Sequence, residues 1–231
     1  VVLEDLAAGI SYNSTTGVAT LNTAFAKEVF LLAKVQMAAA LATGTTVPAS
    51  VLKAQDLIDY GVTGISGLNA TRKADLLARI VATADDGNAV DTLSELQALA
   101  DKVVAIAKIQ DYAISIANPA PGVADYVAAG YGTVTADNLT AINQRIDASD
   151  ATGTATDALI STIVTNGVSN YNTAIAKIAA YANLNTNPAP TVADYVAAGV
   201  TGVTAANLVA VNAKVDAQVQ ANADSTSEVQ T

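Results

Sequence analysis

The 231-residue chain carries 21 acidic and 11 basic residues, a formal net charge of −10, and contains neither histidine nor cysteine. The acidic balance, with Lys and Arg scattered along the chain, argues against nucleic acid and anionic membranes as partners, because both bind clustered basic residues. Without His and Cys, the chain cannot form Cys/His zinc sites, thiol nucleophiles or histidine-based catalytic triads.

The first 21 residues contain a hairpin pattern. Residues 10–13 and 18–21 alternate apolar and polar side chains on either side of a turn that contains Gly17. Such alternation around a glycine-bearing turn predicts two antiparallel strands. From Asn22 to Ala42 the apolar residues recur at helical spacing, which predicts a helix. The most apolar part of that stretch, residues 29–42, is too short to span a bilayer.

One motif then recurs along the chain. Its clearest copy, ADYVAAGVTGVTAANL, begins at Ala193, and a second, ADYVAAGYGTVTADNL, begins at Ala124. A more divergent copy, LIDYGVTGISGLN, begins at Leu57. A fixed long period of this kind indicates repeated supersecondary units. The glycines that open the turn and the asparagines that close it recur every 69 residues, at Gly61, Gly130 and Gly199 and at Asn69, Asn138 and Asn207.

Each copy follows the same plan of three helices. A long helix, expected at residues 91–117 and again at 157–184, stops at an Asn-Pro-Ala-Pro sequence, since proline lacks the amide donor and disfavours helix before it. Thr92 and Glu95 form a capping-box pattern at the start of the first of these helices. In the second, the Thr-Asn-Gly sequence at 165–167 predicts a kink or break.

A short helix, a turn and a third helix complete the plan. Gly130 and Gly199 follow the short helices at 123–129 and 192–198, where a left-handed cap suits glycine best. Thr135 and Thr204 stand where the third helix needs an N-cap, and the asparagine of each copy then falls at the third helical position.

These patterns predict an all-α fold of tandem three-helix-bundle repeats of about 69 residues, preceded by a short N-terminal β-hairpin. The expected divisions are an N-terminal segment at 1–21, helical repeats at 22–87, 88–153 and 154–223, and the start of a further repeat or a tail at 224–231. The last assignment rests on the likeness of Asp224–Gln230 to Asp91–Gln97, where a long helix begins.

Several motifs permit a functional interpretation and a simpler structural one. The Gly-rich turns at Gly61 and Gly130 suggest a phosphate loop, but a helix and not a strand precedes them, so turn geometry is expected. The acidic loop at 85–91 has the oxygen-rich composition of a calcium site without the EF-hand spacing.

Repeated tyrosines (Tyr112 with Tyr181, Tyr126 with Tyr195) suit either ligand stacking or a core position with the hydroxyl at the rim. Lys108 and Lys177 are expected to extend along apolar surface toward water.

The sequence DYVAAGVTGVTAANLVAVNAKV resembles the helix-turn-helix part of GA-like modules, which are themselves similar to the three-helix albumin-binding modules of bacterial surface proteins. The resemblance covers roughly residues 50–220. It implies a three-helix bundle and an extracellular role in a large acidic surface protein of the adhesin type.

The expected function is therefore a non-enzymatic structural or adhesin repeat region of a bacterial surface protein, located outside the cell or at its surface. Two alternatives stay open: a self-assembling subunit of a surface layer or extracellular filament, and a host-protein-binding module of the albumin-binding type. The expected partners are neighbouring repeats, copies of the chain itself, or a host or surface protein. We expect no cofactor, no essential metal and no membrane insertion.

Overall fold

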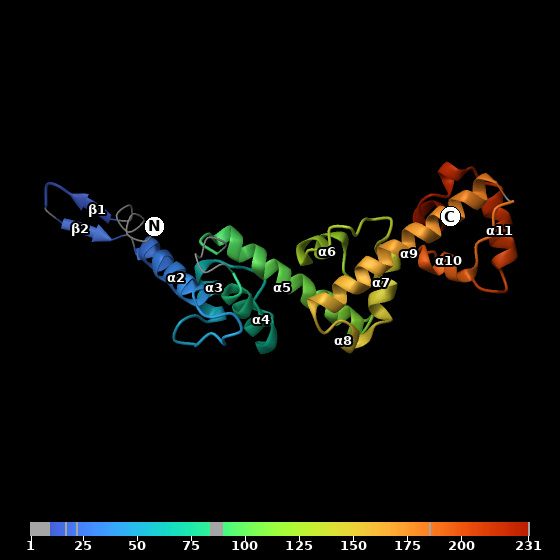
Figure 1. Cartoon of the computed structure of the whole chain (residues 1–231). Coiled ribbons are helices and arrows are strands. Elements are labelled where there is room, and N and C mark those ends of the chain that lie inside the picture. Colours follow the sequence, from blue (N-terminus) through green and yellow to red (C-terminus); the bar gives the residue numbers. More distant parts are fainter. Residues whose placement is uncertain (1–9, 17, 22, 84–89, 185, 231) are drawn as a thin grey trace. The chain divides into compact units, whose positions relative to one another are not determined.

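The structure is a computed structural model that describes residues 10–16, 18–21, 23–83, 90–184 and 186–230 (Figure 1). Helices dominate it. At the N-terminus, strands β1 (Ile10–Asn13) and β2 (Val18–Leu21) pair antiparallel, with Ile10 opposite Leu21. The helices that follow are α2 (Thr23–Ala39), α3 (Ala54–Tyr60), α4 (Ala70–Val81), α5 (Leu93–Ile114), α6 (Val123–Ala129), α7 (Leu139–Asp147), α8 (Asp150–Gly153), α9 (Asp157–Asn183), α10 (Val192–Ala197), α11 (Leu208–Asp216), the 3₁₀ turn η1 (Gln220–Asn222) and α12 (Thr226–Val229).

The chain divides into two compact units, Val1–Val104 and Ala105–Thr231. The boundary falls inside helix α5, whereas the sequence repeat suggested a division at residues 87 and 88, before the helix starts. The reason is the distribution of apolar residues along α5. Leu96, Ala100 and Val103 belong to the core of the first unit, and Ile106 and Ile109 belong to a core of the second.

The first unit has one core, which we call core 1. Helices α2, α3, α4 and the beginning of α5 each bury apolar side chains in it, and aliphatic residues supply nearly all of its volume. Its fully buried members include Leu52, Leu57, Ile65, Leu76, Ile80 and Leu96. Core 1 thus takes one more helix than the three that the sequence repeat assigned to it.

The second unit has two cores that share helix α9. Core 2 contains Ile160 and Val164 from the first half of α9, together with residues of α5, α6 and α7. Core 3 contains Tyr171, Ile178 and other residues from the second half of α9, together with residues of α10 and α11. A single helix of 27 residues therefore supplies apolar side chains to both cores.

Helix α9 is continuous from Asp157 to Asn183, so the sequence at residues 165–167, where a kink or break was expected, does not interrupt it. Gly167 instead lies where α7 packs closely against α9. A Cβ atom at this position would lie 2.5 Å from Cδ1 of Ile142 and 3.0 Å from Cδ of Arg145. The glycine is explained by close helix packing and not by a break in the helix.

The long helices end where their asparagines cap them. The side-chain amide of Asn118 donates to the carbonyl oxygen of Asp111 at 2.7 Å, and that of Asn187 donates to Ala180 at 2.8 Å. Each amide adds a second hydrogen bond to a carbonyl of the last helical turn, which also accepts from a backbone amide four residues later, Ser115 or Leu184. The two asparagines occupy the same place in the Asn-Pro-Ala-Pro sequence, so both helices end in the same way.

Candidate functional site

Three sets of contacts recur around the motif, and the first is an ion pair that joins each long helix to the next short helix. Lys108 Nζ lies 2.6 Å from Asp125 Oδ2, and Lys177 Nζ lies 2.6 Å from Asp194 Oδ2. In the first unit Lys34 and Asp56 form the corresponding pair at 2.8 Å. The same aspartates also accept from backbone amides at the start of their short helices, such as Gly122 and Thr191 at 2.7 Å.

These contacts favour the ionised carboxylate. Burial alone would raise the pKa of Asp194, but the hydrogen bonds from Lys177 and Thr191 and the charge of Lys177 outweigh it and hold this pKa below its usual value. The pKa of Asp56 is lowered in the same way, with burial opposed by Lys34 and by the backbone amide of Lys53. The lysines, which the sequence assigned to apolar surface, are thus half of a structural ion pair.

The second recurring contact joins the short helix to the third helix. Tyr126 and Tyr195 are fully buried, and their hydroxyls donate to the side-chain oxygens of Asn143 and Asn212 at 2.7 Å. The amide of Asn212 in turn donates to the carbonyl oxygen of Pro190 at 3.0 Å. Burial, with smaller effects of Tyr181 and Asp194, raises the pKa of Tyr195 to about 12. These tyrosines are core residues with satisfied hydroxyls, not faces for stacking a ligand.

The third recurring contact closes the turn. Gly61, Gly130 and Gly199 have φ of 110°, 97° and 76°, which is the left-handed conformation expected for a glycine cap. At Gly199 the surroundings are also tight, because a Cβ atom would lie 2.9 Å from the backbone nitrogen of Ala141. That contact links the turn of core 3 to helix α7 of core 2.

The threonine–asparagine pairs differ in detail from the N-cap expected at Thr135 and Thr204. The N-cap positions of α7 and α11 are Asn138 and Asn207. Oδ1 of Asn138 accepts from the amide of Thr135 at 2.9 Å, and Oδ1 of Asn207 accepts from the amide of Thr204 at 2.7 Å, so these side chains close the turn and do not cap an amide of the helix. In the first unit the side chain of Asn69 does cap α4, accepting from the amide of Arg72 at 3.0 Å. The third helix therefore begins directly after the asparagine in all three copies, and only in the first copy does the asparagine side chain cap it.

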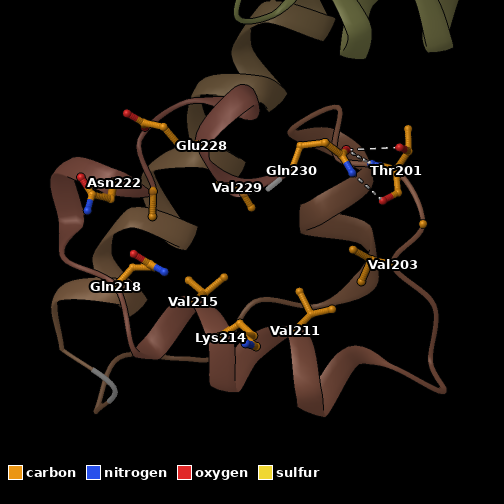
Figure 2. Close-up of a pocket in the computed structure, with 12 residues that line it drawn as sticks. Thr201, Val203, Val211, Lys214, Val215, Gln218, Asn222, Glu228, Val229 and Gln230 are labelled. Atoms are coloured by element: carbon orange, nitrogen blue, oxygen red, sulfur yellow. Dashed lines mark hydrogen bonds between the residues drawn. The ribbon is translucent and has the colours of Figure 1, made fainter.

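A further contact fastens the start of a long helix onto the preceding turn. Oε1 of Gln97, in α5, accepts from the backbone amide and hydroxyl of Thr63 at 2.9 and 3.1 Å. Gln230, which follows α12, makes the same pair of bonds with Thr201 at 2.7 and 3.2 Å (Figure 2). We call this contact the glutamine clamp. It was not expected from the sequence, although the matching positions of Gln97 and Gln230 were visible there.

The clamp borders a groove. This groove of about 430 Å³ lies between α11 and α12, with Val203, Val211, Val215 and Val229 on its walls and Lys214, Gln218 and Glu228 among its polar residues. In Figure 2 Val229 lies across an open space from Val211 and Val215. No constellation of nucleophile, base and anion-binding groups accompanies these residues.

The structure describes the acidic loop only in part. Residues 85–88 of the acidic loop lie outside the described residues. In the loop that parallels it, Asp150 Oδ1 accepts from the amides of Thr152 and Gly153, which is turn geometry. Among the residues that the structure describes, no group of three or more Asp or Glu side chains is placed to hold a metal ion. No helix in the same part of the chain has the length and apolar character needed to cross a membrane.

The structure thus places the eight turn and cap residues in three separate turns, one for each copy of the motif, and not in one shared site. The contacts at all three turns join helices to one another. Comparisons of the chain with protein-family models, with curated proteins and with solved structures found no match.

Proposed function

We propose that the chain is a non-enzymatic structural segment of a bacterial surface protein, in which tandem helical repeats extend the protein outside the cell. The observation that carries the proposal is the sharing of α9 between cores 2 and 3. Sharing of this kind suits an array, because each repeat is stabilised through its neighbour. An enzyme needs a pocket with convergent reactive groups instead.

Two further observations support a structural role. The ion pair and the tyrosine–asparagine bond recur with nearly identical distances in successive copies, so their chemistry is used for assembly of each repeat and not for one specific site. The acidic composition, at −10, favours solubility of a long exposed array. The resemblance to GA-like modules of surface proteins is consistent with this role, and it is the reason why we propose an extracellular location.

Surface location can be tested with antibodies raised against the purified chain. Applied to intact cells of the organism that encodes it, they should label the cell surface, and protease added outside the cells should remove the label. An antibody against a cytosolic protein serves as the control for cell integrity. Labelling that requires permeabilised cells would contradict the proposal.

A further inference from the structure

The groove between α11 and α12 occupies a place that is filled in the other two cores. In core 1, Leu96, Ala100 and Val103 of α5 pack there, and in core 2 Ile160 and Val164 of α9 do so. The spacing is four and then three residues in core 1 and four residues in core 2, which puts these residues on one face of each helix. In core 3 Val229 occupies the first position of such a stripe.

The start of α12 matches the start of α5 contact by contact. Glu228 accepts from the amides of Ser225 and Asp224, as Glu95 accepts from those of Thr92 and Asp91. The glutamine clamp follows in both. In addition, the hydroxyl of Thr226 lies within hydrogen-bonding distance of the carbonyl oxygens of Ala198 and Asp137. The clamp and these bonds fix the direction in which a helix continuing α12 would run.

The walls of the groove are correspondingly less buried than their counterparts. Ile65 of core 1 and Val134 of core 2 are 0% and 2% exposed, whereas the matching Val203 of core 3 is only half-buried. Val211 and Val229 are also half-buried, although Ile142, which matches Val211 in core 2, and Leu96 and Ile160, which match Val229 in cores 1 and 2, are at most 1% exposed. Covering these half-buried apolar side chains with a further helix lowers the free energy of the folded chain.

We propose that this groove is a docking site for the body of a further long helix joined to α12. A helix that fills the groove as α5 fills the corresponding place in core 1 needs a small or branched apolar residue four positions after Val229 and another seven positions after it. Lys214, Gln218 and Glu228 lie at the groove beside the polar flank of the incoming helix. The inference rests on the proposed array function and identifies the surface through which the array accepts its next element.

A lengthened chain tests this directly. Residues Ala98–Ala105 (ALADKVVA), which follow Gln97 in α5, are appended after Gln230, so that the counterparts of Ala100 and Val103 face the groove. The matched control carries glutamate at those two positions, which keeps helix propensity and removes the apolar stripe. The measurement is amide hydrogen exchange in α11 and in the appended residues.

With the apolar extension, we expect exchange in α11 to slow by tenfold or more relative to the original chain and the appended amides to be protected. The glutamate extension should leave α11 unchanged. Val211→Lys, on the groove wall, should abolish the protection, whereas Val209→Lys, on the 82% exposed position of the same helix, should not. Equal exchange with both extensions would overturn the proposal.

Protection that appears only as protein concentration rises would also overturn it, because the occupant would then be a second copy and not a helix joined to α12. These outcomes are independent of cell-surface labelling. A groove that accepts the extension in a protein that is not on the surface would refute the proposed function alone.

Discussion

At the residue scale, the repeated contacts are specified by a few polar side chains in an otherwise aliphatic chain. Asp194 accepts from Lys177 and from two groups of Thr191, so one carboxylate fixes the long helix, the short helix and the N-cap between them. Tyr195 fixes the short helix to the third helix through Asn212. Because each group has a partner, burying it costs little.

The ion pair predicts a specific pH dependence of stability. The pKa of Asp194 is lower in the folded chain than in the unfolded chain, so its contribution is fully present above the unfolded value, about 3.9. It is lost as pH falls through the lower folded value. Asp194→Asn should therefore destabilise the C-terminal unit by about 1 to 3 kcal/mol at pH 7, and the difference from the original chain should shrink toward pH 2.

Chemical unfolding at several pH values measures this, and a double-mutant cycle with Lys177→Met isolates the pair itself. A coupling energy near zero, or a difference in stability that stays constant into acid, would show that the pair does not contribute.

The turn glycine gives a second prediction. Gly199 has φ of 76° and closely approaches the backbone of Ala141, so Gly199→Ala brings both backbone strain and a steric clash. We expect a loss of more than about 1 kcal/mol in the free energy of unfolding. Gly132→Ala is the matched control, since a Cβ atom there would meet nothing within 4 Å. Thermal melting compares the two, and equal melting temperatures would contradict this account of the turn.

At the scale of elements, helix α9 depends on one residue that the sequence alone misassigns. Glycine lowers helix propensity by about 1 kcal/mol relative to alanine, so Gly167 suggested a break. The structure gives a different reason for the glycine: without a side chain, Gly167 leaves space for Ile142 and Arg145 of α7. Gly167→Leu should therefore destabilise the C-terminal unit by about 1 to 3 kcal/mol through overpacking, despite the better helix propensity of leucine.

The control for this substitution is Asn166→Leu, which changes an exposed position next to it in the same helix. Circular dichroism during thermal unfolding reports both variants. A Gly167→Leu chain as stable as the original would show that α7 and α9 do not pack closely at this point.

The helical plan and the turns could be predicted because they depend on local signals. Proline, turn glycine and helical apolar spacing act over a few residues, and the starts and ends of most helices follow from them. The ion pairs could not be derived in the same way, since the lysine and the aspartate lie on different helices and are 17 residues apart in the chain. The signal was nevertheless present, because the lysine and the aspartate of the motif keep that spacing in both of the later copies.

The candidate site was harder to predict than the fold. The resemblance between Asp224–Gln230 and Asp91–Gln97 indicated a helix start, but only the structure reveals that this start folds back onto core 3 through Thr201 and Thr226. Likewise, the sequence predicted an N-cap at Thr204, whereas Asn207 is the N-cap position of α11 and its side chain accepts from the amide of Thr204. Both differences arise from side-chain direction, which residue spacing alone does not determine.

At the scale of the whole molecule, neighbouring cores depend on each other because they share a helix. The relevant helix in the C-terminal unit is α9, whose first half lies in core 2 and whose second half lies in core 3. Units stabilised in this way are described by their own free energies and by the interfaces between them, so damage to one core spreads to the next. Independent domains joined by a linker would not transmit it.

The most direct test of this claim is native-state hydrogen exchange of an Ile160→Ala chain. The substitution opens a cavity in core 2 and should cost about 2 to 5 kcal/mol, while Leu159→Ala, at a 42% exposed position of the same helix, is the control. We predict that Ile160→Ala speeds exchange in α10 and α11 of core 3 as well as in α7 of core 2. Faster exchange in core 2 with α10 and α11 unchanged would contradict the shared-helix account.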